Sequence, residues 1–374
     1  MPYVIRGLSI IFAVDVHQNK KIMRKVFISV VITMLVISSI TAQKKIINIP
    51  DIPGYITLKC DFHIHTVFSD GNVWPTYRID EAWKDGLDVL AITDHLEYQP
   101  HQKYIPTDHN AAYEIAGNLA NERNIILVHS TEITRSMPPG HLNALFLEDA
   151  AEIYVKDDFT TIENAVMQGA FIQWNHPGWK AQEPDGIPKL YDIHHKLLDK
   201  GFIHGIEFFN YNEYYPNILE WCGEYDLAVI ANSDEHQVIA ETYGEMTRPM
   251  TLVFARERSE ESLKEAMFEA RTLAYFNNTL AGREDLLSQV FEASISVSEP
   301  YNENERYEWV EITNISDVPF HMINGSDGVA DAFTIEAGSI TTLRIDKEKV
   351  KTMEWDIKNM LTGYEEYLHV VLEY

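Results

Sequence analysis

Short apolar runs alternate with more polar, helix-like stretches along the chain from about residue 58 onward. Each run is four to seven residues long, as expected for a buried parallel strand. The runs are residues 58–64, 89–92, 125–128, 142–147, 171–174, 206–209 and 228–231, and helical stretches between them include residues 107–121, 160–168 and 189–200. Strand and helix alternating in this way predict an α/β fold, most simply an α/β barrel.

The pattern changes after about residue 286. A further strand–helix–strand unit (250–255, 259–270 and 272–277) completes a first domain, which we predict to span residues 55–283. Residues 288–374 contain alternating runs such as EASISVS, EWVEITNI and EYLHVVLEY, with turn signals at Asn324-Gly325 and Ala337-Gly338. This part is predicted to be a small antiparallel β domain, similar to a β-sandwich, with an accessory structural or binding role.

Polar residues are concentrated where the apolar runs end. In an α/β barrel the C-terminal ends of the strands open at one mouth, where active-site residues gather. Residues at or just after these ends are His63, Asp94, His95, Glu132, His176, Asn210 and Asp234. The sequence therefore predicts that these side chains lie together despite their separation along the chain.

Five histidine- and acid-rich motifs follow apolar runs in order. They are DFHIHT with SDG after it, ITDH, STEI with GHLN after it, NHPG and NSDEH. Alternate residues of a strand point to one side, so His63 and His65 could bind one metal ion. One such pair could equally be a chance surface feature. Five such motifs at strand exits are much harder to explain without a metal site.

This set of motifs resembles that of the PHP family, the polymerase and histidinol phosphatase superfamily, over roughly residues 58–277. The resemblance implies a distorted seven-stranded barrel with three divalent metal ions held by nine residues at its mouth. Matched motif by motif, the nine are His63, His65, Asp70, His95, Glu132, His141, His176, Asp234 and His236. None of the nine is missing, so the chain resembles an active member of the family.

The resemblance also implies how the ions are shared. The first ion would be held by His63, His65, Glu132 and Asp234, the second by Glu132, His141 and His176, and the third by Asp70, His95 and His236. Histidine and carboxylate ligands without thiolate suit Zn, Mn or Fe better than Mg or Ca. The expected cofactors are therefore two to three divalent ions of these metals.

Such a cluster suits phosphoester hydrolysis, because metal ions generate hydroxide near neutral pH and neutralise the phosphoryl oxygens. We predict that the ions bridged by Glu132 generate the nucleophile, while the third ion stabilises the phosphate or the leaving oxygen. Glu132, Asp234 and Arg135 are the predicted catalytic residues. Arg135, three residues after Glu132, is the best placed cation for a phosphate contact. Lys180 and Arg248 are further cations, although an exposed basic residue is usually only solvated.

Residues that flank the ligands have two interpretations of about equal weight. Asp94, Asn143 and Asn175 could orient an imidazole, or they could cap turns at strand exits. Aromatic residues also crowd the loops near the mouth: Trp174, Trp179, Phe208, Phe209, Tyr211, Tyr214 and Tyr215. They could form a wall for an organic group of the substrate. Packing between barrel and helices is the commoner role of aromatics.

The N-terminal residues predict export. Residues 23–42 have Arg24 and Lys25 in front, about 15 largely apolar residues and then small residues up to Ala42, the layout of a secretory signal peptide. A spanning helix needs about 20 apolar residues, so a retained membrane anchor is the weaker interpretation. Met23 could be the true start. We expect residues 1–42 to be removed and the mature protein to be periplasmic or secreted.

Net charge and cysteine content limit which binding partners and covalent cross-links can be expected. The net charge of −27 opposes non-specific binding to nucleic acid. It does not oppose a small anionic substrate, because bound divalent ions reverse the potential inside a pocket. The two cysteines, Cys60 and Cys222, form neither a CxxC motif nor a recognisable disulfide framework. The sequence leaves the oligomeric state open.

The leading function is therefore an exported metal-dependent phosphoesterase that acts on phosphate mono- or diesters. Amide or lactone hydrolysis on the same site is an alternative, because similar barrels host many reactions. A carboxylated lysine between two ions would favour that alternative, whereas a bridging Glu132 favours phosphoester hydrolysis. A vestigial metal- or polysaccharide-binding surface protein is the third possibility, and the complete ligand set counts against it.

Overall fold

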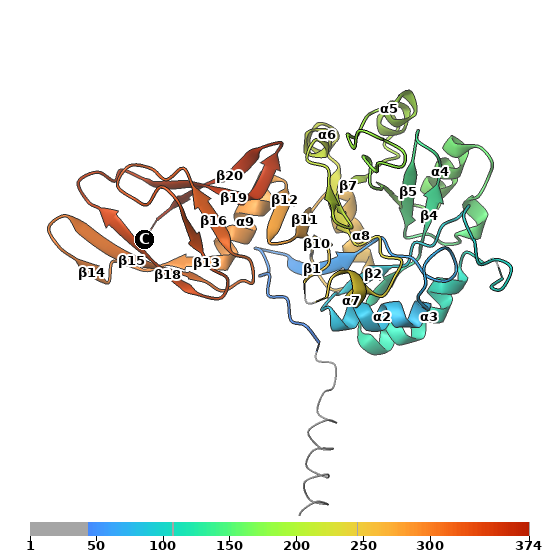
Figure 1. The fold of residues 1–374 in the computed structure, drawn as a ribbon, viewed down its shortest axis with the longest axis horizontal. Coiled ribbons are helices and arrows are strands. Elements are labelled where there is room, and N and C mark those ends of the chain that lie inside the picture. Colours follow the sequence, from blue (N-terminus) through green and yellow to red (C-terminus); the bar gives the residue numbers. More distant parts are fainter. Residues whose placement is uncertain (1–43, 107, 245, 374) are drawn as a thin grey trace, which may run out of the picture. The chain divides into compact units, whose positions relative to one another are not determined.

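The computed structural model describes residues 44–106, 108–244 and 246–373. Its first strands are parallel and alternate with helices: β1 (Ile56–Asp61), α2 (Pro75–Lys84), β2 (Val89–Ala91), α3 (Ala111–Arg123) and β3 (Ile126–Val128). The helices α2 and α3 lie side by side (Figure 1). Pro75 at the start of α2 has no N–H to lose, and Asn124 ends α3 in the left-handed conformation that asparagine tolerates. This part confirms the predicted alternation.

The middle of the chain forms a second sheet, which mixes strand directions. Its strands are β4 (Ser130–Thr134), β5 (His141–Leu145), β6 (Phe171–Trp174), β7 (Gly205–Asn210), β8 (Glu213–Tyr214) and β9 (Ala228–Asn232). The strands β6, β7 and β9 are parallel, as predicted, but β5 runs antiparallel to both β4 and β6. The prediction of parallel strands throughout was therefore wrong for β5. Connecting elements are η1 (Ala151–Ile153), α4 (Asp158–Met167), α5 (Asp192–Asp199), α6 (Ile218–Tyr225) and α7 (Ile239–Thr242).

Two isolated bridges connect the sheets at the strand ends. His95, after β2, bridges Glu132 of β4, and Ile64, after β1, bridges Glu235, after β9. Since β3 leads into β4 with only His129 between them, neighbours run β1, β2, β3–β4, β5, β6, β7, β9 and back to β1. This closed order is the distorted barrel that the sequence predicted, and its bridges lie where the predicted ligands lie.

The outer edge of β1 carries an antiparallel extension. It consists of β10 (Met250–Ala255), β11 (Thr272–Phe276) and β12 (Thr279–Gly282), with α8 (Glu260–Phe268) between the first two. The helix α9 (Glu284–Ser294) follows, so residues 288–294 are helical and not part of the predicted β domain. Leu286, Leu287, Val290 and Phe291 are buried at helical spacing, and this burial overrides the strand-like pattern that follows them.

The C-terminal strands form two antiparallel layers, as predicted. One holds β13 (Ile295–Val297), β14 (Asn302–Glu303), β15 (Tyr307–Asn314) and β18 (Ile340–Asp346); the other holds β16 (Phe320–Ile323), β17 (Phe333–Ile335), β19 (Met353–Gly363) and β20 (Glu366–Leu372). Buried residues alternate along their strands, as in a sandwich core. Asn324 and Gly338 have φ of 57° and 59° at the predicted turns. The second layer also pairs with the first domain, since β19 lies parallel to β12.

No helix in the described ranges is long and apolar enough to cross a membrane. The predicted signal peptide, residues 1–42, lies outside the described residues.

Candidate metal centre

The structure brings all nine predicted ligands together at one end of the barrel. Four overlapping groups have potential ligand atoms within 4.8 Å of one another. The groups are His65, Asp70, His95 and His236; His63, His65 and Asp234; His63, Glu132 and His176; and His95, Glu132 and His141. Together they contain the nine predicted residues and, among the described residues, no others.

The strand directions explain why the nine meet. The residues contributed by β1, β2, β6 and β9 follow the C-terminal ends of these strands, as predicted. Glu132 lies within β4, opposite Asn143 of β5. His141 is the first residue of β5, and because β5 is antiparallel, its N-terminal end lies at the mouth with the C-terminal ends of its neighbours. The strand that departs from the predicted direction therefore still delivers its ligand to the predicted place.

Glu132 is at the centre of the cluster and is fully buried. Its Oε1 lies 3.1 Å from His141 Nδ1, 3.4 Å from His63 Nε2 and 3.8 Å from His176 Nε2. Its Oε2 faces His95 on the other side. A carboxylate whose two oxygens face different histidines can bridge two ions, but the histidines are divided differently from the expectation: His63, His141 and His176 face one oxygen, and His95, expected at the third ion, faces the other.

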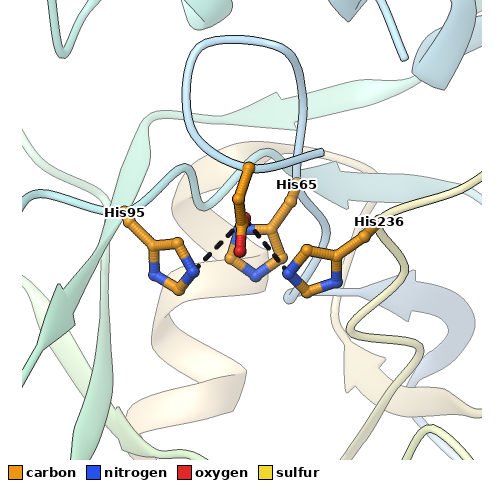
Figure 2. Close-up of side chains that lie close together, drawn as sticks. His65, His95 and His236 are labelled. Atoms are coloured by element: carbon orange, nitrogen blue, oxygen red, sulfur yellow. Dashed lines mark ion pairs between the residues drawn. The ribbon is translucent and has the colours of Figure 1, made fainter. Parts of the chain in front are cut away.

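Asp70 forms a second focus of the cluster. Figure 2 shows the imidazoles of His65, His95 and His236 turned toward one carboxylate. Asp70 Oδ1 lies 3.3 Å from His95 Nε2 and 3.2 Å from His236 Nε2. The rings of His65 and His236 stack with their centroids 4.1 Å apart. The three residues predicted for the third ion, Asp70, His95 and His236, thus lie together, and His65, which was predicted for the first ion, joins them.

Two ligands are held in strained backbone conformations. His176 has φ of 26° and Asp234 has φ of 48°, the left-handed region that side chains other than glycine rarely adopt. Each such residue costs on the order of 1–3 kcal/mol and persists only where the surroundings enforce it. Here Asp234 N donates to His63 O at 2.8 Å, and His176 N donates to Glu207 Oε2 at 2.7 Å. Strain of this kind is typical of functional sites.

The residues present fit a divalent metal cluster. Three buried ligand atoms, His63 Nε2, Asp70 Oδ1 and Glu132 Oε2, have no hydrogen-bond partner among the described residues. A buried polar atom without a partner is costly, and a bound cation removes that cost for all three. The ligand set contains no thiolate, since Cys60 and Cys222 are buried and free, and neither belongs to a ligand group. The donors are therefore of the kind preferred by Zn, Mn or Fe.

The protonation behaviour of the cluster reflects its crowding. Burial penalises the charged form of Glu132, yet the neighbouring His95, His141 and His63 hold its pKa well below the usual value. Burial also disfavours the imidazolium of His95, but Glu132 and Asp70 outweigh it and raise its pKa to about 10. For His65, burial and then His236 and His95 lower the pKa to about 3. His95 therefore holds a proton beside Glu132 and Asp70, and a metal ion would have to displace this proton to bind His95.

Glu207 is not a member of the ligand groups but contacts two of the ligands, His63 and His176, and the sequence analysis missed it. Its Oε1 is 2.8 Å from His63 Nδ1, and its Oε2 accepts the backbone N–H of His176. The amides of Gln173, Asn210 and Asn232 also donate to it. A carboxylate on Nδ1 favours the tautomer that leaves Nε2 free for a metal ion. The signal was present as a charged residue inside the apolar run GIEFFN, where burial requires partners.

The three predicted supporting residues contact other groups than imidazoles. Asn175 Nδ2 donates to Glu132 Oε1 at 2.9 Å and to Asn143 Oδ1 at 2.8 Å. Asn143 in turn donates to the carbonyl of Phe62. Asp94 accepts hydrogen bonds from Thr66 and Ser69, in the loop that leads to Asp70. Asn175 therefore orients the central carboxylate, while Asp94 shapes a ligand-bearing loop.

Arg78 is a second residue that the sequence analysis missed. Its guanidinium is fully buried in α2 and donates to the carbonyls of His65, Glu235 and Gln237, at 2.9, 2.9 and 2.6 Å. It also forms an ion pair with Glu81. These contacts connect the helix to two of the three segments that carry the ligands of the Asp70 group, those of His65 and His236.

The predicted phosphate contacts are not brought to the site. Arg135 forms ion pairs with Glu97 and Asp158 and donates to the carbonyl of Val155, so it points away from the cluster. Residues three apart along an extended segment face opposite sides, which is why Arg135 does not follow Glu132 inward. Arg248 is buried in ion pairs with Asp61 and Asp85, and Lys180 is exposed. None of the three lines the cavity over the cluster.

The cluster forms the floor of a cavity of about 540 Å³. The wall above the floor consists of Trp179, Asn210, Tyr211, Glu213, Glu235 and Gln237. Only two of the seven predicted wall aromatics, Trp179 and Tyr211, line this cavity. Trp174, Phe208, Phe209 and Tyr215 are buried in the core, and Tyr214 is exposed outside the lining. Most of these rings thus have the commoner packing role.

A distorted α/β barrel with histidines and carboxylates gathered at its mouth defines a PHP-like metal-dependent domain. A model of the PHP domain matches residues 61–279, and a model of an Ig-like domain matches residues 295–373. This chain belongs to the PHP domain family. The family assignment confirms the resemblance on which the ligand set was matched.

One solved structure supports the same assignment. A two-domain protein from Bacteroides vulgatus, which contains a predicted PHP-like metal-dependent phosphoesterase, is 39% identical, with a TM-score of 0.85; the match covers 88% of this chain and 98% of that chain. A candidate metal-dependent phosphoesterase from Bifidobacterium adolescentis (18% identity, TM-score 0.40, 56% and 96% covered) and an amidohydrolase from Chromobacterium violaceum with bound sulfate (16%, 0.36, 49% and 89%) are more distant. None of the curated proteins compared with this chain matches it.

Proposed function

We propose that this protein is an exported metal-dependent hydrolase of phosphate mono- or diesters. One observation carries the proposal: nine histidine and carboxylate ligands form one cluster, seven of them line the floor of an open cavity, and three buried ligand atoms lack a hydrogen-bond partner among the described residues. The similarity to the Bacteroides vulgatus protein, itself a predicted phosphoesterase, supports the same reaction class. The proposed cofactors are two to three divalent ions, with Zn, Mn and Fe as candidates, which would be held by residues of the four overlapping ligand groups.

The chain's own residues have distinct roles in this proposal. Bound divalent ions supply Lewis-acid stabilisation of the phosphoryl oxygens and lower the pKa of a water molecule. Glu132 and Asp234 hold the ligand groups together, because each carboxylate faces at least two histidines. Glu207 fixes the ring of His63 and the backbone of His176. No lysine or arginine of the described ranges lines the cavity, so charge on the phosphate has to be met at the floor.

Two observations disfavour the alternatives. Amide or lactone hydrolysis at a site bridged by a carboxylated lysine would need a lysine in the cavity, and none of the described lysines lines it. The central carboxylate is Glu132, as expected for a phosphoesterase of this family. A vestigial metal-binding role is disfavoured because all nine ligands are present and lie within reach of one another.

The test uses purified protein, stripped of metal and reloaded with Zn, Mn or Fe. It is assayed on 4-nitrophenyl phosphate, bis(4-nitrophenyl) phosphate, an aryl amide and a lactone, beside the Glu132→Ala variant. We expect metal-dependent turnover of at least one phosphate ester, reduced at least about 100-fold in the variant because Glu132 belongs to two of the ligand groups. Turnover of the amide or lactone alone would contradict the proposal, and so would full phosphoesterase activity in metal-loaded Glu132→Ala.

Export is a separate part of the proposal. Arg24, Lys25 and the apolar run that ends at Ala42 support a cleaved signal peptide. Expression of the full chain in a bacterial host, followed by fractionation and N-terminal sequencing, tests it. We expect the mature protein outside the cytoplasm, beginning at Gln43. An uncleaved chain that stays in the cytoplasm would contradict export without affecting the proposed reaction.

A further inference from the structure

The wall of the metal cavity has an unusual composition for a site that receives an anionic ester. Its non-ligand residues are two carboxylates, two aromatic rings and two amides: Glu213, Glu235, Trp179, Tyr211, Asn210 and Gln237. No lysine or arginine in the described part of the chain lines it. Positive charge from metal ions would be confined to the floor, so the wall presents negative and aromatic surface.

Glu213 is held at the wall by a hairpin. It lies in β8, opposite Asn210 of β7, and Asn210 Nδ2 is 3.3 Å from Oδ2 of the predicted ligand Asp234. Tyr215 donates its hydroxyl to Glu213 Oε2 at 2.7 Å, which fixes the carboxylate. The other carboxylate oxygen, Glu213 Oε1, accepts no hydrogen bond from the described residues. A fixed carboxylate oxygen is thus available close to the floor.

Glu235 adds a second carboxylate, which is more deeply buried. The residue is 2% exposed, and its Oε1 accepts the N–H groups of His236 and Gln237 at 3.1 and 2.8 Å. Its Oε2 is buried and has no hydrogen-bond partner in the described structure. Glu235 belongs to none of the metal-ligand groups. A buried, unpartnered carboxylate oxygen requires a donor or a positive charge to compensate it.

The two aromatic rings complete this surface. Trp179 is 40% exposed and Tyr211 is 43% exposed, so each has ring surface open to a ligand. Trp179 packs against the rings of His141 and His176, with centroids 5.7 and 5.3 Å apart, and therefore borders the floor. Aromatic faces attract organic cations, and tryptophan does so most strongly.

We propose that the organic group of the natural phosphoester carries a positive charge, as a quaternary ammonium or an amine, and is bound by Glu213, Glu235, Trp179 and Tyr211. This inference rests on the proposed function, because it assumes that the phosphate is bound at the metal floor. The substrate is then a zwitterion whose phosphate faces the ions and whose cation faces the acidic, aromatic wall. Glu235 already has a favourable charge interaction with the buried Arg78, whereas Glu213 accepts its hydrogen bond from the neutral hydroxyl of Tyr215. A neutral sugar or nucleoside group would therefore leave Glu213 without a counter-charge.

The test compares two diesters that share a leaving group and differ in the other ester group, which is choline in one and methyl in the other. The metal-loaded full chain is assayed with 4-nitrophenyl phosphorylcholine and with 4-nitrophenyl methyl phosphate, which release the same nitrophenol. We expect kcat/KM to be at least about 10-fold higher for the choline ester. In Glu213→Gln and in Trp179→Leu this ratio should fall at least about 3-fold, while Glu220→Gln, on the exposed face of α6, should leave both esters unchanged.

A binding measurement separates the two proposals. Calorimetry with phosphorylcholine and methyl phosphate reports recognition of the cation without turnover, and we expect tighter binding of phosphorylcholine, weakened in Glu213→Gln. If neither ester is hydrolysed but phosphorylcholine binds preferentially, the proposed reaction fails and the cation site stands. Equal kcat/KM for the two esters together with equal binding of the two ligands would overturn the cation site, even if both esters are hydrolysed.

Discussion

A carboxylate within a buried apolar strand has to be compensated, and Glu207 of β7 is compensated by five donors. His63 Nδ1 and the backbone N–H of His176 are two of them, so one residue orients two proposed ligands. Side-chain amides supply the other three. Because every neighbour donates, an amide at this position would place its own N–H groups against other donors. The charge of Glu207 and its acceptor pattern are both needed.

The Glu207→Gln variant should therefore lose metal affinity. Outer contacts to a ligand are commonly worth 10- to 100-fold in affinity, and we expect a loss of about that size. Chelator competition with Zn measures the affinity, and circular dichroism checks the fold. Glu183→Gln is the matched control, because Glu183 is also buried but pairs with Lys189 and Tyr191, outside the ligand groups. Equal Zn affinity in Glu207→Gln and the native protein would contradict the role of Glu207.

His204 couples stability to pH at a site away from the metal ligands. Burial lowers its pKa from 6.5 to about 4, and its Nδ1 accepts the N–H of Ile172 at 2.9 Å, which requires the neutral ring. Between pH 6.5 and 4 the unfolded chain binds a proton at this residue that the folded chain does not. Stability should therefore fall as pH falls through this window, by on the order of 1–3 kcal/mol from this group.

Urea unfolding between pH 4 and 8 measures this contribution. The comparison is with His204→Asn, whose side-chain oxygen can accept the same hydrogen bond but does not titrate. We expect the variant to lose less stability than the native protein between pH 6.5 and 4. Identical pH dependence in the two proteins would show that His204 does not carry the effect.

At the scale of an element, the loop between β1 and α2 depends on close approach of its backbone. A Cβ at Gly71 would lie 2.7 to 2.8 Å from backbone atoms of His65 and Thr66. Gly71 N donates to Thr66 O, and Asp94 holds Thr66 and Ser69. Glycine is thus required for packing here, and this packing positions the neighbouring Asp70.

The Gly71→Ala variant should displace Asp70 and remove one group of metal ligands. We expect lower metal stoichiometry, measured by elemental analysis, and a loss of about 1–3 kcal/mol in stability from overpacking. Gly117→Ala is the control, because a Cβ there, within α3, meets no atom within 4 Å. The control should be neutral or more stable by about 0.5–1 kcal/mol. Full metal loading of Gly71→Ala would contradict this account of the loop.

Sequence patterns predicted the elements better than their directions. Runs such as residues 171–174 and 250–255 match β6 and β10, because a buried run bounded by polar residues has few other solutions. The antiparallel course of β5 was missed, since strand direction depends on which neighbour it pairs with and not on its own residues. The residues STEIT were not recognised as β4, because a strand that faces a polar cluster is not an apolar run.

At the site, too, local features could be predicted and long-range contacts could not. Metal ligands could be matched because their residue types and order form local motifs. Glu207 and Arg78 could not be assigned, because their partners lie far away in sequence and only the fold brings them together. Arg135 was placed by proximity to Glu132 along the chain, and the fold turns it to the other side of the strand. Sequence distance is a poor measure of distance at a barrel mouth.

At the scale of the molecule, the PHP and Ig-like domains share a sheet. Leu280 and Ala281 of β12 pair with Met360 and Leu361 of β19. Asn359, which is 6% exposed, donates to the carbonyls of Asn278 and Pro319 and so connects the domains by its side chain. Because backbone pairing and a buried side chain both cross the boundary, we expect the domains to unfold together.

Asn359→Ala tests this coupling. It leaves buried carbonyls without their donor, so we expect a loss of about 2–3 kcal/mol in a single thermal transition, followed by calorimetry. Lys358→Ala, at an exposed position of the same strand, should change stability by no more than about 0.5 kcal/mol. Metal affinity should be unchanged in both variants. Two separate transitions in the native protein would contradict the coupling.

The acidity of the whole molecule makes bound metal a source of stability as well as reactivity. With a net charge of −27, the folded chain repels itself, and Asp70, Glu132 and Asp234 concentrate part of that charge at one place. Metal ions that bind only the folded state offset this repulsion. At a free metal concentration 100 times the dissociation constant, one site adds about 2.7 kcal/mol.

Chelation should therefore lower the melting temperature, and the shift should shrink from pH 8 to pH 6, because histidine ligands must lose protons to bind metal. Differential scanning fluorimetry with and without chelator measures the shift. The Asp234→Ala variant should show a smaller shift, because it lacks the carboxylate ligand that lies beside His63 and His65. A chelator-induced shift of equal size in Asp234→Ala would mean that the stabilising metal binds somewhere other than this cluster.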